Sequence, residues 1–220
     1  GGGLWKTTNG GTSWQPLTDN DSVWMYIFSL AIAPVNQNVV YAGTGNNGNV
    51  VIKSTDGGAT WAPTGAGPGG SMIRKILIHP TSTNIVFACA SNGIWRSTNA
   101  GASWTQVHST YKEDIEFKPD DLNIMYATGN DVARSTDNGV TWTVLNAAQG
   151  ITNTGRTLVA VSPANPNYVY ICQASGSLFG RIYKSTDAGV SFTTTVTGSA
   201  ASGTNYFGYE ANGTGTSGQI

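Results

Sequence analysis

The sequence predicts an all-β fold built from one repeated unit, and three observations carry this prediction. A nine-residue motif, Lys-Ser-Thr-Asp-Gly-Gly-Ala-Thr-Trp at residues 53–61, recurs in variant form from residues 6, 96, 134 and 184. A second pattern, Pro-x-x-x-Asn-x-x-Tyr or Phe, begins at Pro34, Pro80, Pro119 and Pro163 and alternates with the first. Short β-branched and aromatic runs separate these turns, and no segment has helical spacing.

One repeat contains four short strands. In the first full repeat they are expected at 30–33, at 39–42, at 50–53 and from residue 60 onward. Four strands in roughly 40 to 50 residues, repeated in order, are typical of the blades of a β-propeller. A β-solenoid would need shorter coils, and a sandwich would not repeat its turns. The sequence therefore predicts an all-β propeller of four-stranded blades.

The order of the motifs divides the chain into blades. About four and a half blades are expected, as part of a larger propeller of about seven or more, whose remainder would be a partner of this chain. The alternative is a closed ring of five blades in which the tail completes the first blade, although the tail lacks the repeated strands. Residues 1–17 are expected to form the second half of a blade. Complete blades are expected at 18–65, 66–108, 109–146 and 147–197, followed by a Gly/Ser/Thr-rich link towards a missing blade at 198–220.

Charge and hydropathy exclude several classes of function. Charged residues make up only 10% of the chain, against a usual ~25%, and the formal net charge is -1. Without a basic run there is no footprint for a phosphate backbone, so nucleic acid is not an expected partner. No apolar stretch approaches the ~18 residues of a membrane span. A hydrophobic share of 39% exceeds that of a disordered chain.

The two cysteines are expected to be structural. Cys89 and Cys172 lie in apolar, strand-like runs, which predicts two buried free thiols, with a single disulfide as the alternative. Neither has a supporting His or Cys for zinc. No metal and no cofactor is expected.

The repeated motif is expected to serve the fold. An Asp or Asn two residues before a Gly accepts hydrogen bonds from its own turn, the Gly adopts positive φ, and the closing aromatic covers the turn. Because two copies carry an amide, the position needs an acceptor and not a charge, which argues against metal ligation or proton transfer. These structural residues are Asn9, Asp56, Asn99, Asp137 and Asp187, with Trp14, Trp61, Trp104, Trp142 and Phe192. The opening basic residues are expected on a solvated face, namely Lys6, Lys53, Arg96, Arg134 and Lys184.

Ser-x-Asp-x-Gly-x-Thr-Trp resembles the Asp-box, or bacterial neuraminidase repeat, of sialidases, xyloglucan-type endoglucanases, sortilin-type receptors, photosystem II assembly factors and secreted Bacteroidetes proteins. The resemblance covers residues 4–192, and the second pattern looks most like the xyloglucanase and secreted Bacteroidetes branch. It implies a propeller in which the Asp-box joins the third and fourth strands of a blade, away from the ligand site. It implies no particular activity.

Strand order separates two faces of each blade. Turns joining strands one to two and three to four share a uniform face, whereas the two-to-three turns and the links between blades form an irregular face, where binding can be specified. Aromatic rings with Asn and Arg donors suit sugars, although each of these residues could also pack between blades. The ligand-binding candidates are Trp24, Tyr26, Asn46, Asn47, Arg74, Tyr111, Arg156, Phe179 and Arg181.

Catalytic residues are harder to assign. A glycosidase needs two carboxylates ~5 to 9.5 Å apart. Outside the motifs, the pair to test is Glu113 or Asp114 facing Asp131 or Asp21. The sequence lacks the sialidase arginine pattern and any stretch resembling the xyloglucanase catalytic segments.

The leading expectation is a non-catalytic propeller module, secreted or on a bacterial cell surface, that binds polysaccharide or a protein through its irregular face. One alternative is a fragment of a xyloglucan-type endo-β-glucanase whose catalytic acids lie partly outside these residues. The other is a protein-binding propeller akin to assembly or sorting factors.

Overall fold

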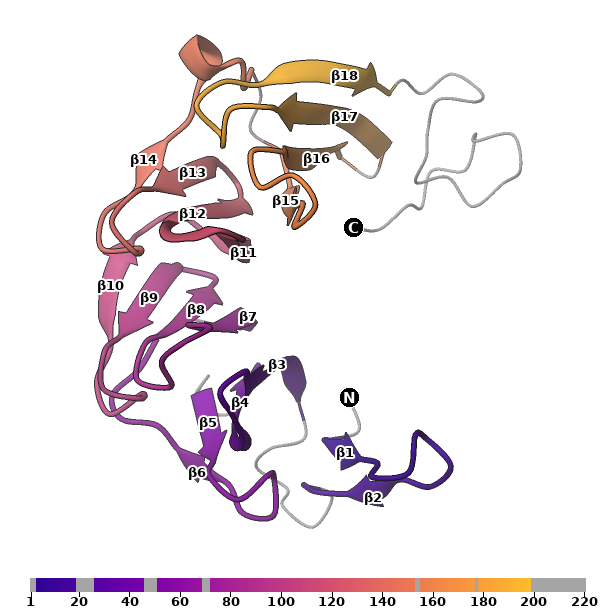
Figure 1. Cartoon of the computed structure of the whole chain (residues 1–220), viewed down its shortest axis with the longest axis vertical. Coiled ribbons are helices and arrows are strands. Elements are labelled where there is room, and N and C mark those ends of the chain that lie inside the picture. Colours follow the sequence, from indigo (N-terminus) through magenta and orange to yellow (C-terminus); the bar gives the residue numbers. More distant parts are fainter. Residues whose placement is uncertain are drawn as a thin grey trace. The chain divides into compact units, whose positions relative to one another are not determined.

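Four-stranded antiparallel sheets make up most of the protein, as seen in a computed structural model of the chain (Figure 1). The structure describes residues 3–18, 26–45, 51–68, 72–152, 155–176 and 178–198. Its strands are β1 (Trp5–Lys6), β2 (Gln15–Pro16), β3 (Ile27–Ala33), β4 (Asn36–Thr44), β5 (Val51–Ser54), β6 (Ala62–Pro63), β7 (Ile73–Ile78), β8 (Val86–Ala90), β9 (Gly93–Ser97), β10 (Thr105–His108), β11 (Lys112–Lys118), β12 (Asp121–Gly129), β13 (Val132–Ser135), β14 (Thr143–Val144), β15 (Thr157–Val161), β16 (Val169–Ser175), β17 (Leu178–Ser185) and β18 (Thr193–Thr197).

Each complete sheet is a meander of strands that are consecutive in the chain. The sheets run β3-β4-β5-β6, β7-β8-β9-β10, β11-β12-β13-β14 and β15-β16-β17-β18, while β1 and β2 form a two-stranded sheet. The predicted all-β fold of four-stranded propeller blades is therefore confirmed. A one-turn 3-10 helix, η1 (Ala147–Gln149), was not predicted; Asn146 and Gln149 close it with a capping box. No helix of the described residues is long and apolar enough to cross a membrane.

The chain divides into two units, Gly1–Ser109 and Thr110–Ile220. In each unit a hydrophobic core fills the space between neighbouring blades. Tyr41 packs with Ile76 and Ile78 in the first unit, where β3 and β4 contact β7. Tyr126 packs with Val159 in the second, where β11 and β12 contact β15.

The repeated motif forms a turn closed by its own side chains. Asp137 Oδ1 accepts hydrogen bonds from the backbone N–H groups of Val140 at 3.1 Å and Thr141 at 2.9 Å. Its Oδ2 accepts from the Thr141 hydroxyl at 2.6 Å, and its Oδ1 also accepts from the Ser135 hydroxyl at 2.8 Å. The carboxylate therefore caps the turn.

An amide serves the same turn in two of the five copies. Asn99 Oδ1 accepts from the backbone N–H of Ser103 at 2.9 Å, while its Nδ2 donates to the Ser103 hydroxyl at 2.9 Å. Asn9 makes the same two contacts with Ser13. The Ser or Thr hydroxyl four residues after the motif position donates to the carboxylate when that position is Asp, and accepts from the amide when it is Asn. The turn therefore tolerates either residue.

Hydrogen bonding shifts the pKa of the motif carboxylates. Burial raises the pKa of Asp137, but hydrogen bonds from Thr141, Ser135 and Val140 outweigh it and lower the pKa to about 2. Burial likewise raises the pKa of Asp187, but hydrogen bonds from Ser191, Ser185 and Val190 lower it to about 2. A carboxylate this acidic is unsuited to proton transfer near neutral pH.

The residue after the motif Asp or Asn joins the two turns of the uniform face. It has positive φ even where it is not glycine, with values of 55° at Ala100, 57° at Asn138 and 57° at Ala188. In four blades its N–H donates to the backbone carbonyl of the Asn in the Pro-x-x-x-Asn turn. These pairs are Gly57 with Asn38, Ala100 with Asn84, Asn138 with Asn123 and Ala188 with Asn167.

The carbonyl of the same residue fastens one blade to the next. In the second unit, Ala188 O accepts from the Tyr126 hydroxyl at 3.0 Å and from Arg134 Nε at 2.9 Å. The blades approach so closely that a Cβ added to Gly189 would lie 2.6 Å from the Tyr126 ring. This contact, with the positive φ of 76°, explains the glycine.

The first unit uses the same junction. Ala100 O accepts from the Tyr41 hydroxyl at 3.0 Å and from Lys53 Nζ at 3.2 Å. Burial raises the pKa of Tyr41 to about 12, so its hydroxyl remains a donor. The expectation that the opening basic residues form a solvated face is wrong for Lys53 and Arg134, which are partly buried and bind a neighbouring turn.

The closing aromatics differ in exposure. Trp61 and Trp142 each donate Nε1–H to the glycine carbonyl of their own turn, at 3.0 and 3.2 Å. Trp104 and Phe192 are buried, whereas Trp14 is exposed. Both cysteines are free, Cys89 buried and Cys172 partly buried.

We expect acid stability to depend on the motif carboxylates. Because their pKa is lowered in the folded state, the stability that they contribute is present above the unfolded pKa of about 4 and is lost as the pH falls toward about 2. The triple substitution Asp56→Asn, Asp137→Asn, Asp187→Asn should therefore flatten the decline in unfolding free energy between pH 5 and pH 2, measured by urea denaturation. The matching alanine variant should be less stable at every pH, and equal acid slopes in all three proteins would contradict this account.

We expect the junction tyrosine to contribute measurably to stability. Tyr126→Phe keeps the ring but removes the donor to Ala188 O, and it should lower the free energy of unfolding by about 1 kcal/mol. Phe87, which occupies the equivalent position in another blade, shows that the fold accepts the ring alone. Guanidinium denaturation measures the difference, and a variant as stable as the parent would show that the hydroxyl contributes nothing.

Candidate functional site

A β-bulge lies near the start of the first strand in three of the four complete blades. The bulged residues are Phe28 in β3, Arg74 in β7 and Glu113 in β11, and strand pairing shifts register across each of them. In the fourth complete blade, the first strand, β15, pairs with β16 without such a shift. Bulges re-aim side chains and are frequent beside functional sites. Because the three residues differ in chemistry while the strands around them repeat, these positions are the candidate binding site of each unit.

In the first unit the bulges bring an aromatic ring and a guanidinium together. The Arg74 guanidinium lies 6.0 Å from the centroid of the Phe28 ring. Phe28 lies over Gly45, where an added Cβ would be 1.8 Å from the ring, and Gly45 N–H donates to the carbonyl of Tyr26 at 3.0 Å. Tyr26 and Phe28 are both exposed. Such a cluster offers apolar faces and hydrogen-bond donors, the two features that a sugar ring requires.

In the second unit a buried carboxylate holds an exposed arginine. Glu113 Oε2 accepts from Arg156 Nε at 2.5 Å, and Oε1 accepts from the Tyr111 hydroxyl. The side chain of Glu113 is 6% exposed, whereas that of Arg156 is 46% exposed. Glu113 and Tyr111 thus fix the guanidinium in place while it faces solvent, which suits the binding of a polar ligand.

Two further acids from the predicted catalytic pairings, Asp131 and Asp114, also have intramolecular partners. Asp131 Oδ1 lies 2.7 Å from Nζ of the fully buried Lys112. Asp114 Oδ1 accepts from Ile115 N–H at 3.0 Å, and Oδ2 accepts from Val159 N–H at 3.1 Å, which ties β11 to β15. All three acids are therefore used to hold neighbouring strands or side chains.

The remaining ligand-binding candidates are less favourably placed. Phe179 is 2% exposed, so the expectation that its ring forms a binding platform is wrong, because the ring packs against the neighbouring backbone at Gly198. Arg181 Nη1 donates to the Thr152 hydroxyl at 2.7 Å on the surface. Trp24, Asn46, Asn47 and Asp21 lie outside the described residues.

Phe28 was not predicted as a site residue, and Lys112 was noted only as one of the few charges near the start of a blade's first strand. Phe28 lies in an alternating strand and gives no sign in the sequence of the bulge that turns it. Lys112 reads as a surface residue, yet it is fully buried beside Asp131. The scarcity of charge in this chain is the only signal that draws attention to Lys112. Among the described residues, no three of His, Cys, Asp and Glu come together as a metal site.

No family model matches this chain. It is 29% identical to a xyloglucanase from a Paenibacillus species, in a match covering 66% of this chain and 19% of the relative. It is 28% identical to the xyloglucanase Xgh74A of Acetivibrio thermocellus, covering 87% of this chain and 23% of the relative. The chain thus spans about a fifth of the length of these curated relatives. The crystal structure of a GH74 enzyme from Niastella koreensis superimposes with a TM-score of 0.69 at 23% identity, covering 93% of this chain and 35% of that one, which shows the fold.

These relatives correct one expectation. The leading interpretation, a non-catalytic binding module, is wrong, because the curated proteins that match are xyloglucanases. They favour the first alternative, a section of a xyloglucan hydrolase.

We expect the two ion pairs to differ in their effect on stability. Asp131→Asn removes a negative charge 2.7 Å from the ammonium group of the buried Lys112 and should cost about 3 kcal/mol or more, whereas Glu113→Gln removes the charge beside a half-exposed arginine and should cost about 1 kcal/mol. Urea denaturation at pH 7 measures both. As a control, the double substitution Lys112→Met, Asp131→Asn should recover most of the loss, and equal losses in the two single variants would contradict the assignment.

Proposed function

We propose that this chain is a section of a glycoside hydrolase that acts on xyloglucan. The observation that supports the proposal most directly is the similarity to curated xyloglucanases, which extends over up to 87% of the chain. The same relatives support an extracellular location, where a plant polysaccharide would be met. We also infer that the repeated motif is the Asp-box, because its turn is closed by the side chains that define that repeat.

We propose that the irregular face of these blades binds the polysaccharide. In the first unit, exposed Tyr26 and Phe28 supply apolar faces beside the Arg74 guanidinium. In the second, Arg156 is an exposed donor held by Glu113. Stacking of sugar rings on aromatic side chains, with hydroxyls accepting from guanidinium groups, is the recognition chemistry that these residues provide.

We propose that the catalytic acids are supplied at least in part by residues outside this chain. Hydrolysis of a glycosidic bond needs one carboxyl group to protonate the leaving oxygen and a second to act as base or nucleophile. The partners of Glu113, Asp114 and Asp131 support this view, since each acid would have to leave a contact that holds the fold.

We expect the chain to bind soluble xyloglucan without releasing sugar from it. Affinity electrophoresis in gels that contain xyloglucan, with xylan and starch as control polysaccharides, measures binding, and a reducing-end assay measures hydrolysis. Arg156→Ala should weaken binding by about tenfold, since it removes one charged donor, and Tyr26→Ala should weaken it by a similar amount.

Asp120→Asn, on the uniform face, is the matched control and should bind as the parent does. A chain that ignores every polysaccharide would contradict the binding proposal. Release of sugar that is abolished by Asp131→Asn in a still folded protein would place a catalytic acid within the chain.

A further inference from the structure

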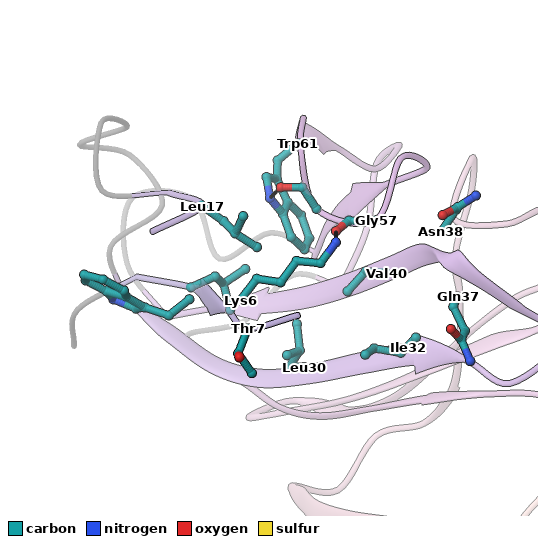
Figure 2. A pocket seen from close by; sticks show the side chains of 13 residues that line it. Lys6, Thr7, Leu17, Leu30, Ile32, Gln37, Asn38, Val40, Gly57 and Trp61 are labelled. Atoms are coloured by element: carbon teal, nitrogen blue, oxygen red, sulfur yellow. Dashed lines mark hydrogen bonds between the residues drawn. The ribbon is translucent and has the colours of Figure 1, made fainter. Parts of the chain in front are cut away.

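The blade junctions of the two units are alike at the uniform face. In three places a basic side chain of one blade donates to a turn carbonyl of the next. These contacts are Lys6 Nζ with Gly57 O (Figure 2), Lys53 Nζ with Ala100 O and Arg134 Nε with Ala188 O. At the opposite end of the junction, on the irregular face, the two units differ in chemistry.

The first unit fills this end of its junction with an apolar side chain. Ile73 pairs with Ala90 across β7 and β8, and both residues are fully buried in the core cluster of the unit. Gly43, in β4 of the preceding blade, approaches so closely that an added Cβ would lie 2.5 Å from the Ile73 side chain. Ile73 therefore occupies the space between the two blades here.

The second unit has polar side chains at the same three positions. Thr157 pairs with Gln173 across β15 and β16, where the first unit has its Ile–Ala pair. Thr128 takes the place of the glycine, since each stands two residues after its junction tyrosine. Thr157 Oγ1 accepts from Gly129 N–H at 3.1 Å and donates to Gly129 O at 2.9 Å, which joins β15 to the end of β12.

Two buried polar atoms at this place have no hydrogen-bond partner among the described residues. They are Thr128 Oγ1 and Gln173 Nε2, and the two residues are 0% and 1% exposed. The Gln173 amide is held at its other atom, because Oε1 accepts from the Tyr183 hydroxyl at 3.1 Å. Buried polar groups that lack a protein partner are usually satisfied by a bound molecule, most often ordered water.

The chemistry of the two atoms selects the ligand. An amide nitrogen can only donate, whereas a threonine hydroxyl can donate or accept. A molecule that bridges them must accept a hydrogen bond and be small, because both atoms are closed to solvent. Thr157 Oγ1 offers a third contact, since Gly129 N–H uses one of its two lone pairs. Water meets these requirements, and an internal water typically makes about three hydrogen bonds.

We propose that the second unit binds an internal water molecule between β12 and β16, where it accepts from Gln173 Nε2 and bridges to Thr128 Oγ1. The water joins the third and fourth complete blades at the irregular face, as the Tyr126 hydroxyl does at the uniform face. Gln173 is followed by Ala174, whose N–H donates to Arg156 O at 2.9 Å. The bound water therefore also holds the strand that anchors the backbone of Arg156.

Water contacts of the Gln173 side-chain amide test the proposal. In isotope-labelled protein, its two N–H protons should show nuclear Overhauser contacts with a long-lived water molecule. Thr128→Val keeps the shape of the side chain but removes the hydroxyl, so these contacts should be lost. Thr143→Val, the same substitution at an exposed site of the same unit, is the matched control and should leave them unchanged.

A crystal structure of the parent chain gives a second measurement that depends on no variant. Density for a water should lie within about 3.2 Å of both Gln173 Nε2 and Thr128 Oγ1. A Gln173 amide that binds another protein oxygen, or that shows no water contact, would overturn the proposal. Water contacts that persist unchanged in Thr128→Val would show that the threonine is not a ligand and would overturn the bridge between the blades.

Discussion

Within each unit, the backbone of one left-handed residue in a motif turn connects neighbouring blades. At Ala100 and Ala188 the N–H binds the neighbouring turn of the same blade, and the carbonyl accepts from a basic side chain and a tyrosine hydroxyl of the blade before it. The Asp or Asn side chain that closes the turn holds that residue at positive φ. The packing of one blade on the next within each unit therefore depends on the backbone conformation of this turn residue.

The sequence was sufficient for the repeat and its turns, because their signals are local. An acceptor two residues before a glycine caps its own turn whatever surrounds it. The contacts of Lys53 and Arg134 with a neighbouring blade were not predictable in the same way, because an isolated basic residue in a sequence is expected to be exposed to solvent. Only the packing of one blade on the next brings their side chains to a carbonyl.

The candidate site was predicted at the level of the face and not of the individual contacts. Arg156 and Glu113 were both identified from the scarcity of charge, but the contact between them joins residues 43 positions apart. Phe179 was assigned to the irregular face, but the structure places it in β17, where its ring is buried. The bulges that turn Phe28 and Arg74 depend on strand register, which the sequence does not specify at these residues.

The junction also shows how a cation can be held in this chain without an ion pair. A lysine or arginine that binds a carbonyl dipole needs no acidic partner at that contact. Dipoles, unlike mobile counter-ions, belong to the backbone and cannot be displaced by salt. In a chain with only 10% charged residues, Lys53 and Arg134 can therefore hold neighbouring blades together through backbone dipoles.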